Sequence, residues 1–348
     1  MSTVDRELLR RLPKAELHCH LDGSVRPQTL LDLGKEYGVQ MPRADAAAMR
    51  EFMTVRDARN LEDYLARFQV TLSVMQHAEA IERIAYELGE DAHRDGVWYL
   101  EARFAPVLNV KHGLTPQEVV EAAIRGLARA EKDHGVIGRV IVTALRDRSP
   151  ESSLELARLA VAFKHRGVAG FDLAGAERGN PASTHARAFE HARSHDMACT
   201  CHAGEGDGGH SIREAVHACG ADRIGHGTRL FEDEALLEYV NDRRIPIEIC
   251  LTSNVQTRVA GSYASHPLRQ YYDAGLNVVL STDNRLMSAT TLTDEYAHAA
   301  TDLGFSLHQL ATMALNSFES AFFPWPDRQT MMARARTEIA KLLEGAAP

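Results

Sequence analysis

The feature that most constrains the fold is a recurring order of segments, in which a short apolar run is followed by a longer amphipathic stretch. The short runs have the length and composition of buried strands, and the long stretches have the apolar spacing of helices. Strands that alternate with helices in this way form parallel β-α-β units. The predicted strands are Glu16–His20, Trp98–Phe104, Arg139–Ala144, Val168–Leu173, Ala198–His202, Asp222–Gly225, Pro246–Cys250 and Asn277–Ser281. The helical pattern is clearest at Pro27–Tyr37, Pro116–His134, Ser153–Arg166 and Ser183–Ser194.

Eight such units predict a closed (β/α)₈ TIM-type barrel rather than an open sheet. The chain has no Ser/Gly/Pro-rich linker and no low-complexity tract, so we expect one domain over residues 1–348. Residues 45–76, between the first two strands, have the pattern of extra helices instead of a single crossover. In a barrel, this insertion is expected to lie above the C-terminal rim as a lid. Residues 307–343 are helical in pattern and are expected to complete the outer ring of helices.

Charge and composition exclude several kinds of partner. The net charge is −9 and no basic stripe occurs, which argues against nucleic acid and leaves a neutral small molecule as the partner. No apolar run approaches the roughly 20 residues that span a membrane, and the N-terminal residues lack the apolar core of a signal peptide. The five cysteines are odd in number and contain no C-x-x-C pair, which argues against a disulfide framework. These features predict a cytoplasmic protein and leave its oligomeric state open.

Four predicted strands end in side chains that can bind a metal or exchange a proton. These ends are His18-Cys19-His20-Leu21-Asp22-Gly23, His202-Ala203-Gly204-Glu205, Gly225-His226-Gly227 and Ser281-Thr282-Asp283-Asn284. Residues two apart in a strand face the same side, so His18 and His20 are expected to point to one centre. The C-terminal ends of barrel strands meet at one rim, which would bring all four segments together. Three imidazoles and one carboxylate, with a position left for water, match the ligand set of a catalytic zinc site.

Each of these residues also has a purely structural interpretation. A lone histidine in a strand is more often a hydrogen-bonded core residue than a ligand, and an H-x-H pair alone leaves the two interpretations balanced. H-x-H together with three further polar strand ends favours metal binding. Cys19 and Cys201 alternate with the histidines, so we expect them to pack on the opposite face. Ser253 and Asn254 follow the seventh strand, and we expect them to cap a turn or helix rather than contact a substrate.

Five segments resemble the adenosine deaminases, in order and over nearly the whole chain. They are P-K-A-E-L-H-C-H-L-D-G-S from Pro13, H-A-G-E from His202, R-I-G-H-G from Arg223, E-I-C-L-T-S-N from Glu248 and S-T-D-N from Ser281. H-x-H-L-D-G alone occurs in many metal-dependent amidohydrolases, whereas its combination with H-A-G-E and G-H-G is specific. The H-x-E…P-C-x-x-C signature of the cytidine-type zinc deaminases is absent. The resemblance implies a hydrolase with one Zn²⁺ per chain that converts adenosine or 2′-deoxyadenosine to inosine or deoxyinosine and ammonia.

The resemblance also implies a role for each matching residue. His18, His20, His202 and Asp283 would bind zinc. Glu205 would give a proton to purine N1, and His226 would orient the metal-bound water and stabilise the developing alkoxide, so that Glu205, His226 and Asp283 form the catalytic set. Gly175 would offer its backbone N–H to purine N3, Asp22 would hold the ribose 5′-hydroxyl, and Asn284 would contact N7. His20 would border the substrate as well as the metal.

The reaction itself requires groups of this kind. C6 of adenine is a poor electrophile, and an amine is a poor leaving group. Zinc supplies hydroxide by lowering the pKa of water to about 7, and protonation of N1 draws electrons out of the ring as hydroxide attacks C6. A glutamic acid that donates this proton must begin protonated, which requires a pKa raised by burial.

One position departs from the family pattern. The best-known members have two acids and a proline where this chain has Asp283-Asn284-Arg285. Asp283 keeps the metal ligand. Purine N7 is an acceptor, to which an ionised carboxylate cannot donate but an asparagine amide can. The change is therefore compatible with a purine substrate, although it leaves the choice of purine open.

Several other functions compete with adenosine deamination. Related sequences deaminate 6-aminodeoxyfutalosine or adenine, which differ from adenosine at the ribose end, where Asp22 favours a free 5′-hydroxyl. AMP is disfavoured because no basic cluster flanks Asp22 in the sequence. A non-catalytic relative that only binds nucleosides would not need the complete ligand set and proton donor. Two-metal amidohydrolases usually need a bridging lysine or an extra histidine, which H-A-G-E does not match. Another divalent ion could also take the place of zinc.

Overall fold

Eight parallel strands follow one another around the barrel in the order of the sequence. The computed structural model describes residues 4–56 and 67–345, and the strands are β1 (Lys14–His20), β2 (Val97–Phe104), β3 (Ile137–Leu145), β4 (Val168–Ala174), β5 (Ala198–Ala203), β6 (Arg223–His226), β7 (Ile247–Ile249) and β8 (Val278–Leu280). The barrel closes between β8 and β1, where the His20 N–H donates to the Asp283 carbonyl at 2.7 Å and the Asp283 N–H donates to the His18 carbonyl at 2.9 Å. The predicted (β/α)₈ barrel is confirmed.

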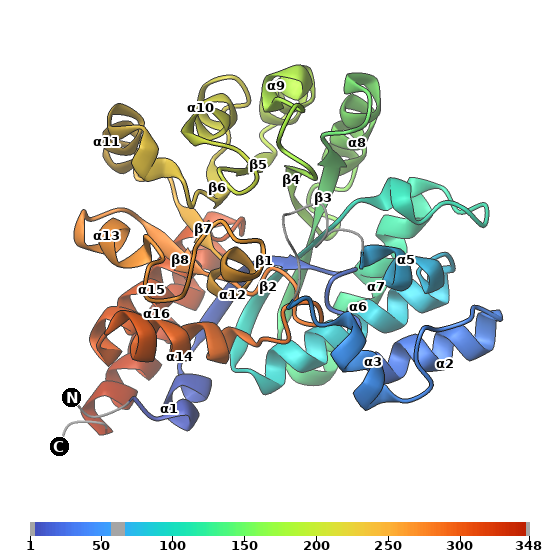
Figure 1. Ribbon diagram of the computed structural model, residues 1–348, viewed down its shortest axis with the longest axis horizontal. Coiled ribbons are helices and arrows are strands. Elements are labelled where there is room, and N and C mark those ends of the chain that lie inside the picture. Colours follow the sequence, from blue (N-terminus) through green and yellow to red (C-terminus); the bar gives the residue numbers. More distant parts are fainter. Residues whose placement is uncertain (1–3, 57–66, 346–348) are drawn as a thin grey trace.

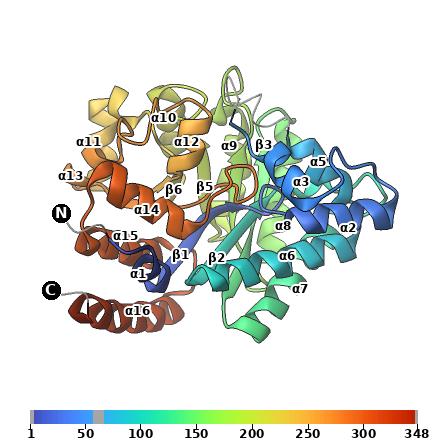
Figure 2. The ribbon, with the colours of Figure 1, turned by 60° about the horizontal axis from the view of Figure 1, so that its bottom comes forward.

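Helices surround the strands, and the first and last described helices lie on the same side of the barrel (Figure 1, Figure 2). The helices are α1 (Arg6–Arg11), α2 (Pro27–Tyr37), α3 (Ala46–Met53), α5 (Phe68–Val74), α6 (Ala78–Arg94), α7 (Pro116–His134), α8 (Pro150–Ala162), α9 (Ala186–Ser194), α10 (Gly209–His217), α11 (Glu234–Asp242), α12 (Leu251–Gln256), α13 (Leu268–Asp273), α14 (Leu292–Leu303), α15 (Leu307–Ser320) and α16 (Trp325–Gly345). Three short 3₁₀ turns also occur in the described part, at Pro106–Leu108, Ala182–His185 and Leu230–Glu232.

Local sequence signals explain why the helices start and stop where they do. α7 begins with a capping box, in which the Thr115 side chain accepts from the Glu118 N–H and the Glu118 carboxylate accepts from the Thr115 N–H. It ends at Gly135, whose φ of 78° is left-handed and suits glycine. α8 begins earlier than the pattern predicted, because Ser149 caps it and Pro150 occupies its first position. The pattern at Ser183–Ser194 divides into a 3₁₀ turn followed by α9.

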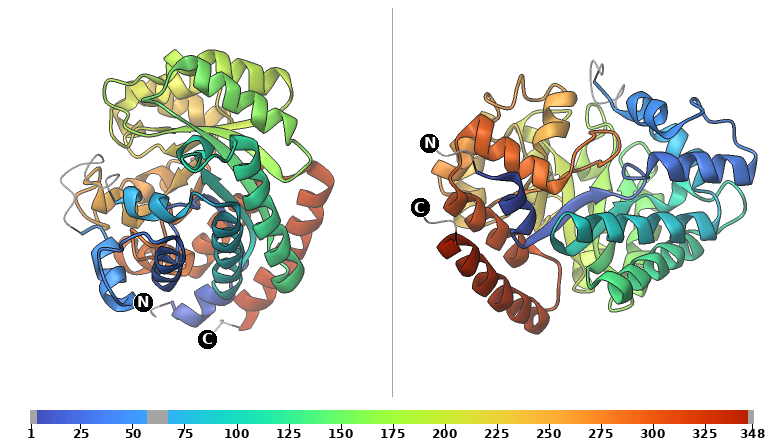
Figure 3. Two further views of the ribbon diagram at one scale, coloured as in Figure 1. Left: turned by 90° about the vertical axis from the view of Figure 1, so that its right-hand side faces the viewer. Right: turned by 90° about the horizontal axis from the view of Figure 1, so that it is seen from below.

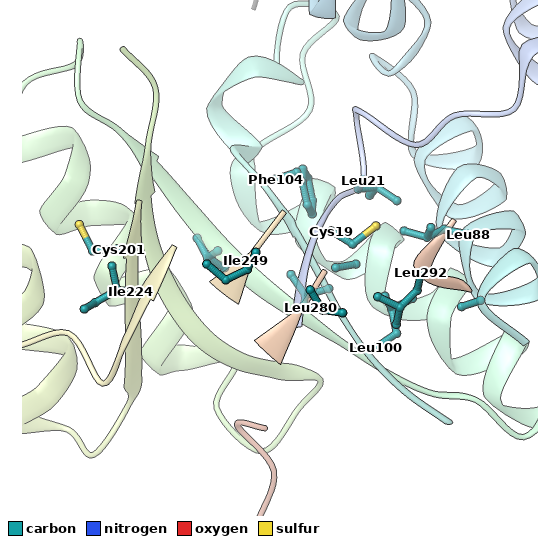
Figure 4. Packing of buried hydrophobic residues seen from close by; sticks show 14 of the residues in the cluster. Cys19, Leu21, Leu88, Leu100, Phe104, Cys201, Ile224, Ile249, Leu280 and Leu292 are labelled. Carbon is teal, nitrogen blue, oxygen red and sulfur yellow. The ribbon is translucent and has the colours of Figure 1, made fainter. Parts of the chain in front are cut away.

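The hydrophobic core fills the space between the strands and the outer helices. Cys19 and Cys201 are fully buried in it, as expected for packing residues. Cys201 on β5 is paired in register with Ile224 on β6, and the two side chains lie together on the outer side of these strands (Figure 4). All five cysteines are buried and free. Among the described residues, no helix is both long and apolar enough to cross a membrane.

Of the helices between β1 and β2, α2 packs against α3 and α5 near the C-terminal end of β1, whereas α6 packs against β2 and α7 in the outer ring (Figure 3). α3 and α5 belong to the insertion predicted at residues 45–76, of which residues 57–66 lie outside the described part. The insertion is tied to the rim, because the Val55 N–H donates to the Met287 carbonyl in the loop after β8 at 2.8 Å. The ring of Phe68, at the start of α5, lies 6.3 Å from the ring of His20 at the end of β1. Part of the insertion therefore adjoins the strand ends that carry the polar motifs.

Candidate metal centre and active site

The C-terminal ends of β1, β5 and β8 bring the four predicted metal ligands to one point. Nε2 of His20 lies 3.1 Å from Nε2 of His202, and Oδ1 of Asp283 lies 3.4 Å from Nε2 of His20 and 3.5 Å from Nε2 of His18. Donor atoms about 2.8 to 3.5 Å apart can share one ion that each of them binds at about 2.0 Å. The nitrogens of His18, His20 and His202 all lie within 4.8 Å of one another.

Two of the site residues have a left-handed backbone conformation. Asp283 and His226 both have a φ of 61°, in the left-handed region that residues other than glycine seldom adopt. At Asp283 this conformation occurs where its N–H and carbonyl both bond to β1. Backbone strain of this kind persists where the surrounding structure enforces it, and it is common at functional sites.

Buried carboxylates orient two of the histidines. Nδ1 of His18 lies 2.8 Å from Oε2 of Glu248, and Nδ1 of His202 lies 3.1 Å from Oδ1 of Asp172. An imidazole that donates from Nδ1 keeps the lone pair on Nε2 for a metal, which is the usual arrangement behind metal-binding histidines. Nε2 of His18 is buried and has no hydrogen-bond partner among the described residues. This unpaired acceptor points into the cluster and fits a metal ligand.

A ladder of alternating charges lies directly beneath the cluster. Glu101, Arg223, Glu248, Arg103 and Asp172 pair in that order, and each exposes at most 1% of its side chain. Together with Asp283, four carboxylates face two guanidinium groups, which leaves two negative charges in a buried space. A divalent cation would balance this excess, because buried charge is stable only when it is compensated. The residues present therefore fit a divalent metal.

Glu205 lies beside the cluster in the turn after β5. Its Oε2 is 3.4 Å from Nε2 of His226, and 7% of its side chain is exposed. Burial, reinforced by the negative charges of Asp283 and Glu177, raises the pKa of Glu205 well above its usual value. The turn is held by Glu177, whose Oε2 accepts the backbone N–H of Glu205 at 3.1 Å and that of Asp207 at 2.6 Å. The structure thus provides a buried acid with a raised pKa at a fixed place.

His226, at the end of β6, is buried beside His18, with 4.8 Å between the ring centroids. Burial and the neighbouring histidines hold the pKa of His226 well below its usual value. Its Nδ1 lies 3.0 Å from Nδ2 of Asn254, and its Nε2 faces Glu205. His226 is therefore a neutral imidazole between an amide on one side and the catalytic centre on the other.

The predicted substrate residues lie in the loops that follow β1, β4 and β8. Asp22 and Asn284 are buried, and Oδ1 of each has no hydrogen-bond partner among the described residues. Oδ1 of Asp22 lies 4.0 Å from Nδ1 of His20, and burial raises the pKa of Asp22 to about 7. Asn284 packs against Gly23, where an added Cβ would lie 1.7 Å from Oδ1 of Asn284. Gly175, in the turn after β4, has a φ of 99° that favours glycine.

The expectation that Ser253 and Asn254 cap a turn or helix was wrong. Both lie inside α12, and the residue at its N-cap, Cys250, makes no side-chain capping bond. The Ser253 hydroxyl donates to Oδ2 of Asp283 at 2.6 Å, and Asn254 contacts His226. The start of α12 points at the site because its backbone follows the end of β7, so the two side chains reach neighbouring strand ends instead of their own backbone.

The residues that support the ligands were not predicted from the sequence. Glu248 begins a segment that was quoted for its resemblance, and Asp172 lies in the predicted strand Val168–Leu173. An ionisable residue inside a buried strand was the available signal at both positions. Glu177 carries no comparable signal, because its role depends on a turn more than twenty residues away.

Known proteins resemble this chain over most of its length. The family model for adenosine deaminase matches residues 13–338. The probable adenosine deaminase of Dictyostelium discoideum is 42% identical over 324 residues, which cover 93% of this chain and 42% of that protein. The adenosine deaminase of Mycobacteroides abscessus is 41% identical over 343 residues and covers 93% of this chain and 94% of its own length.

Two solved structures resemble the whole barrel. The adenine deaminase of Arthrobacter aurescens superimposes with a TM-score of 0.88 at 28% identity and covers 95% of this chain and 99% of its own. An Arabidopsis N6-mAMP deaminase superimposes with a TM-score of 0.85 at 30% identity, again covering 95% of this chain and 99% of its own. These structures share the fold, and their names differ in the purine compound on which each protein acts.

Proposed function

The chain belongs to the adenosine deaminase family, a family of hydrolases that act on C–N bonds, and we propose that it deaminates adenosine and 2′-deoxyadenosine to inosine and deoxyinosine. The observation that carries the proposal is the position of a buried acid with a raised pKa, Glu205, beside three imidazoles and a carboxylate that lie close together. This pairing of an acid with a metal-ligand cluster suits a reaction in which the leaving amine must be activated while water attacks.

The metal ligands are His18, His20, His202 and Asp283, and the ion is one Zn²⁺ per chain. Neutral imidazoles with a single carboxylate suit zinc among the common divalent ions. When bound here, zinc supplies hydroxide near neutral pH by lowering the pKa of water to about 7. Glu248 and Asp172 keep His18 and His202 in the orientation needed to bind it.

The protein's own side chains carry the proton and the developing charge. Glu205 donates its proton to purine N1 as the attacking oxygen adds to C6. Protonation of N1 draws electrons out of the aromatic ring, so that C6 becomes a better electrophile. His226 hydrogen-bonds to that oxygen and stabilises its negative charge. The hydroxyl now on C6 gives its proton to the amine, which leaves as ammonia while C6 becomes a carbonyl and N1 keeps the proton from Glu205. Burial of Glu205 serves the first step directly, because it raises the pKa of the acid and so favours the protonated form that donates to N1.

Recognition of the nucleoside uses polar groups in the loops that follow β1, β4 and β8. Asp22 accepts the ribose 5′-hydroxyl beside His20, which borders the substrate. The amide nitrogen of Asn284 donates to purine N7, and the N–H of Gly175 donates to N3. Buried polar atoms usually have partners, so the unpaired Oδ1 of Asp22 supports a polar ligand at this place.

The arginines nearest in sequence to Asp22 and Asn284 already have carboxylate partners, which favours a nucleoside over a nucleotide as the substrate. Arg26 is paired with Glu90 at 2.5 Å and Asp91 at 2.7 Å. Arg285 is paired with Glu16 at 2.8 Å and Asp95 at 3.1 Å. A 5′-phosphate would have to compete with these carboxylates for its counter-charge.

The proposed function is tested by parallel turnover of five compounds by the purified, zinc-loaded protein. We expect adenosine and 2′-deoxyadenosine to be converted with higher kcat/KM than adenine, 6-aminodeoxyfutalosine or N6-mAMP. Turnover is measured by the change in ultraviolet absorbance and by release of ammonia, or of methylamine in the case of N6-mAMP. Preference for one of the other three would replace the proposed substrate. Zinc content without turnover of any of them would indicate a nucleoside-binding relative that has lost catalysis.

Replacing Asn284 by Leu should lower kcat/KM for adenosine by about 10- to 100-fold, the cost of leaving a buried acceptor such as N7 unsatisfied. Zinc content should stay the same, because Asp283 and not Asn284 is the ligand. The matched control is 7-deazaadenosine, which has no N7, and we expect its turnover by the Asn284→Leu variant to change much less. Equal losses for both nucleosides would mean that N7 is recognised elsewhere.

A further inference from the structure

The geometry points to Asn254 as a positioning residue that keeps the proton of His226 on Nε2, through a hydrogen-bond relay that starts at the backbone N–H of Leu268 and passes through His266. The inference rests on the proposed function, because it assigns the direction in which His226 acts there. The four side chains of the relay, Asn254, His266, Thr228 and His226, each expose at most 3% of their surface. Water therefore does not supply alternative partners.

The relay begins at His266, whose protonation is set by the backbone. The Leu268 N–H donates to Nδ1 of His266 at 3.0 Å. A backbone N–H is always a donor, so Nδ1 of His266 must carry a lone pair. Burial lowers the pKa of His266 to about 3, which keeps the ring neutral. The single proton of this imidazole is therefore on Nε2.

The proton on His266 fixes the orientation of the Asn254 amide. Nε2 of His266 lies 3.0 Å from Oδ1 of Asn254, and the Thr228 hydroxyl donates to the same oxygen at 3.0 Å. An oxygen at this position accepts two hydrogen bonds. With the amide turned over, its NH₂ group would face the N–H of His266, which places two donors against each other. Oδ1 therefore faces His266, and Nδ2 faces the opposite way.

The orientation of Asn254 in turn fixes the tautomer of His226. Nδ2 of Asn254 can only donate, and it lies 3.0 Å from Nδ1 of His226. Nδ1 of His226 must then accept, which leaves its proton on Nε2. That nitrogen faces Oε2 of Glu205 at 3.4 Å, on the side of the metal ligands. His226 is thus prepared as a hydrogen-bond donor to the attacking oxygen and is prevented from acting as its general base.

The spectroscopic test measures the tautomer without reference to activity. The protein is labelled with ¹⁵N in its histidine rings, and long-range ¹H–¹⁵N spectra are recorded on the zinc-loaded protein. The signal of His226 is assigned as the one missing from the His226→Gln variant. We expect an unprotonated Nδ1 and a protonated Nε2. A proton on Nδ1 in the unmodified protein would overturn the relay, whether or not the protein deaminates adenosine.

The Asn254→Asp substitution keeps the size of the side chain but replaces the amide nitrogen that donates to His226 by an oxygen that can only accept. One carboxylate oxygen can still accept from His266 and Thr228, but the other cannot donate to His226. We expect the proton of His226 to appear on Nδ1, and kcat for adenosine to fall by about 10²- to 10³-fold, the usual loss when one donor to an oxyanion is removed. KM should change less than about threefold, since ground-state contacts remain. An unchanged tautomer or an unchanged kcat in this variant contradicts the inference.

Three further variants distinguish a positioning role from a general loss of structure. Asn277→Asp makes the same substitution just before β8, where Asn277 contacts Ser320, and it should leave both the tautomer and kcat unchanged. His266→Gln keeps a donor toward Asn254 and should retain the tautomer, whereas His266→Leu removes it and should give a mixture. Equal effects of Gln and Leu at position 266 would remove His266 from the relay. If the unmodified protein shows the expected tautomer but deaminates none of the five compounds, the relay holds and the proposed function fails.

Discussion

Glu205→Gln is expected to lower kcat for adenosine by about three orders of magnitude, within the range that a positioned general acid contributes. Glutamine has the size of glutamic acid and can still hydrogen-bond to purine N1, but it cannot transfer a proton there. Adenosine should therefore bind with a Kd within about threefold of normal, and the zinc content should be unchanged, because Glu205 is not a ligand. The measurements are single-turnover kinetics, equilibrium binding of adenosine and elemental analysis.

The matched control is Glu190→Gln on the exposed face of α9. It makes the same chemical change far from the strand ends and should leave kcat unaltered. Substantial turnover by Glu205→Gln would remove Glu205 from its assigned role. Loss of zinc from this variant would instead mean that the acid supports the metal cluster, a different function from proton donation.

The fold could be predicted from the sequence because it depends on local patterns. Apolar runs mark strands, and helix bounds such as those of α2 and α7 follow from proline near the first turn and glycine after the last. The weakest predictions were at helix starts such as α8, where the capping serine and the following proline determine the bound. A cap of this kind outweighs the hydrophobic pattern because it satisfies backbone N–H groups that the helix itself leaves unpaired.

The candidate site was predictable only in part. His18 and His20 lie two apart in one strand, and parallel strands bring His202 and Asp283 to the same rim, so topology alone indicates the cluster. The partners of these residues could not be predicted in this way. Glu248 contacts His18 across 230 positions of sequence, and Asn254 contacts His226 from a helix whose direction is set by β7. Side-chain contacts of this kind depend on the packing of whole elements, which periodicity does not describe.

Glu248→Gln is expected to lower the free energy of unfolding by about 3–5 kcal/mol, the usual cost of breaking a buried ion pair. Oε1 of Glu248 accepts from Nε of Arg223 at 2.7 Å and from the Thr200 hydroxyl at 3.1 Å. Its Oε2 accepts from Nδ1 of His18 at 2.8 Å and from Arg103 at 2.9 Å. Glutamine has one oxygen, so its NH₂ group would have to face two of these four donors. Although burial opposes ionisation, Arg103 and Arg223 hold the pKa of Glu248 well below its usual range, so a full charge is lost.

The same change should weaken zinc binding by about 10- to 100-fold, because His18 loses the acceptor that keeps its Nε2 lone pair directed at the metal. Bound zinc stabilises the folded state, so unfolding is measured by denaturant titration of the metal-free protein, and zinc affinity by competition with a chelator. The control is Glu131→Gln, which breaks the half-exposed pair with Arg139 at 3.0 Å and should cost less than about 1 kcal/mol. If Glu248→Gln cost no more than this control, the ladder of charges beneath the cluster would not be what holds the histidines in place. The balance between two guanidinium groups and the carboxylates around them would then give no reason for a divalent ion at this point.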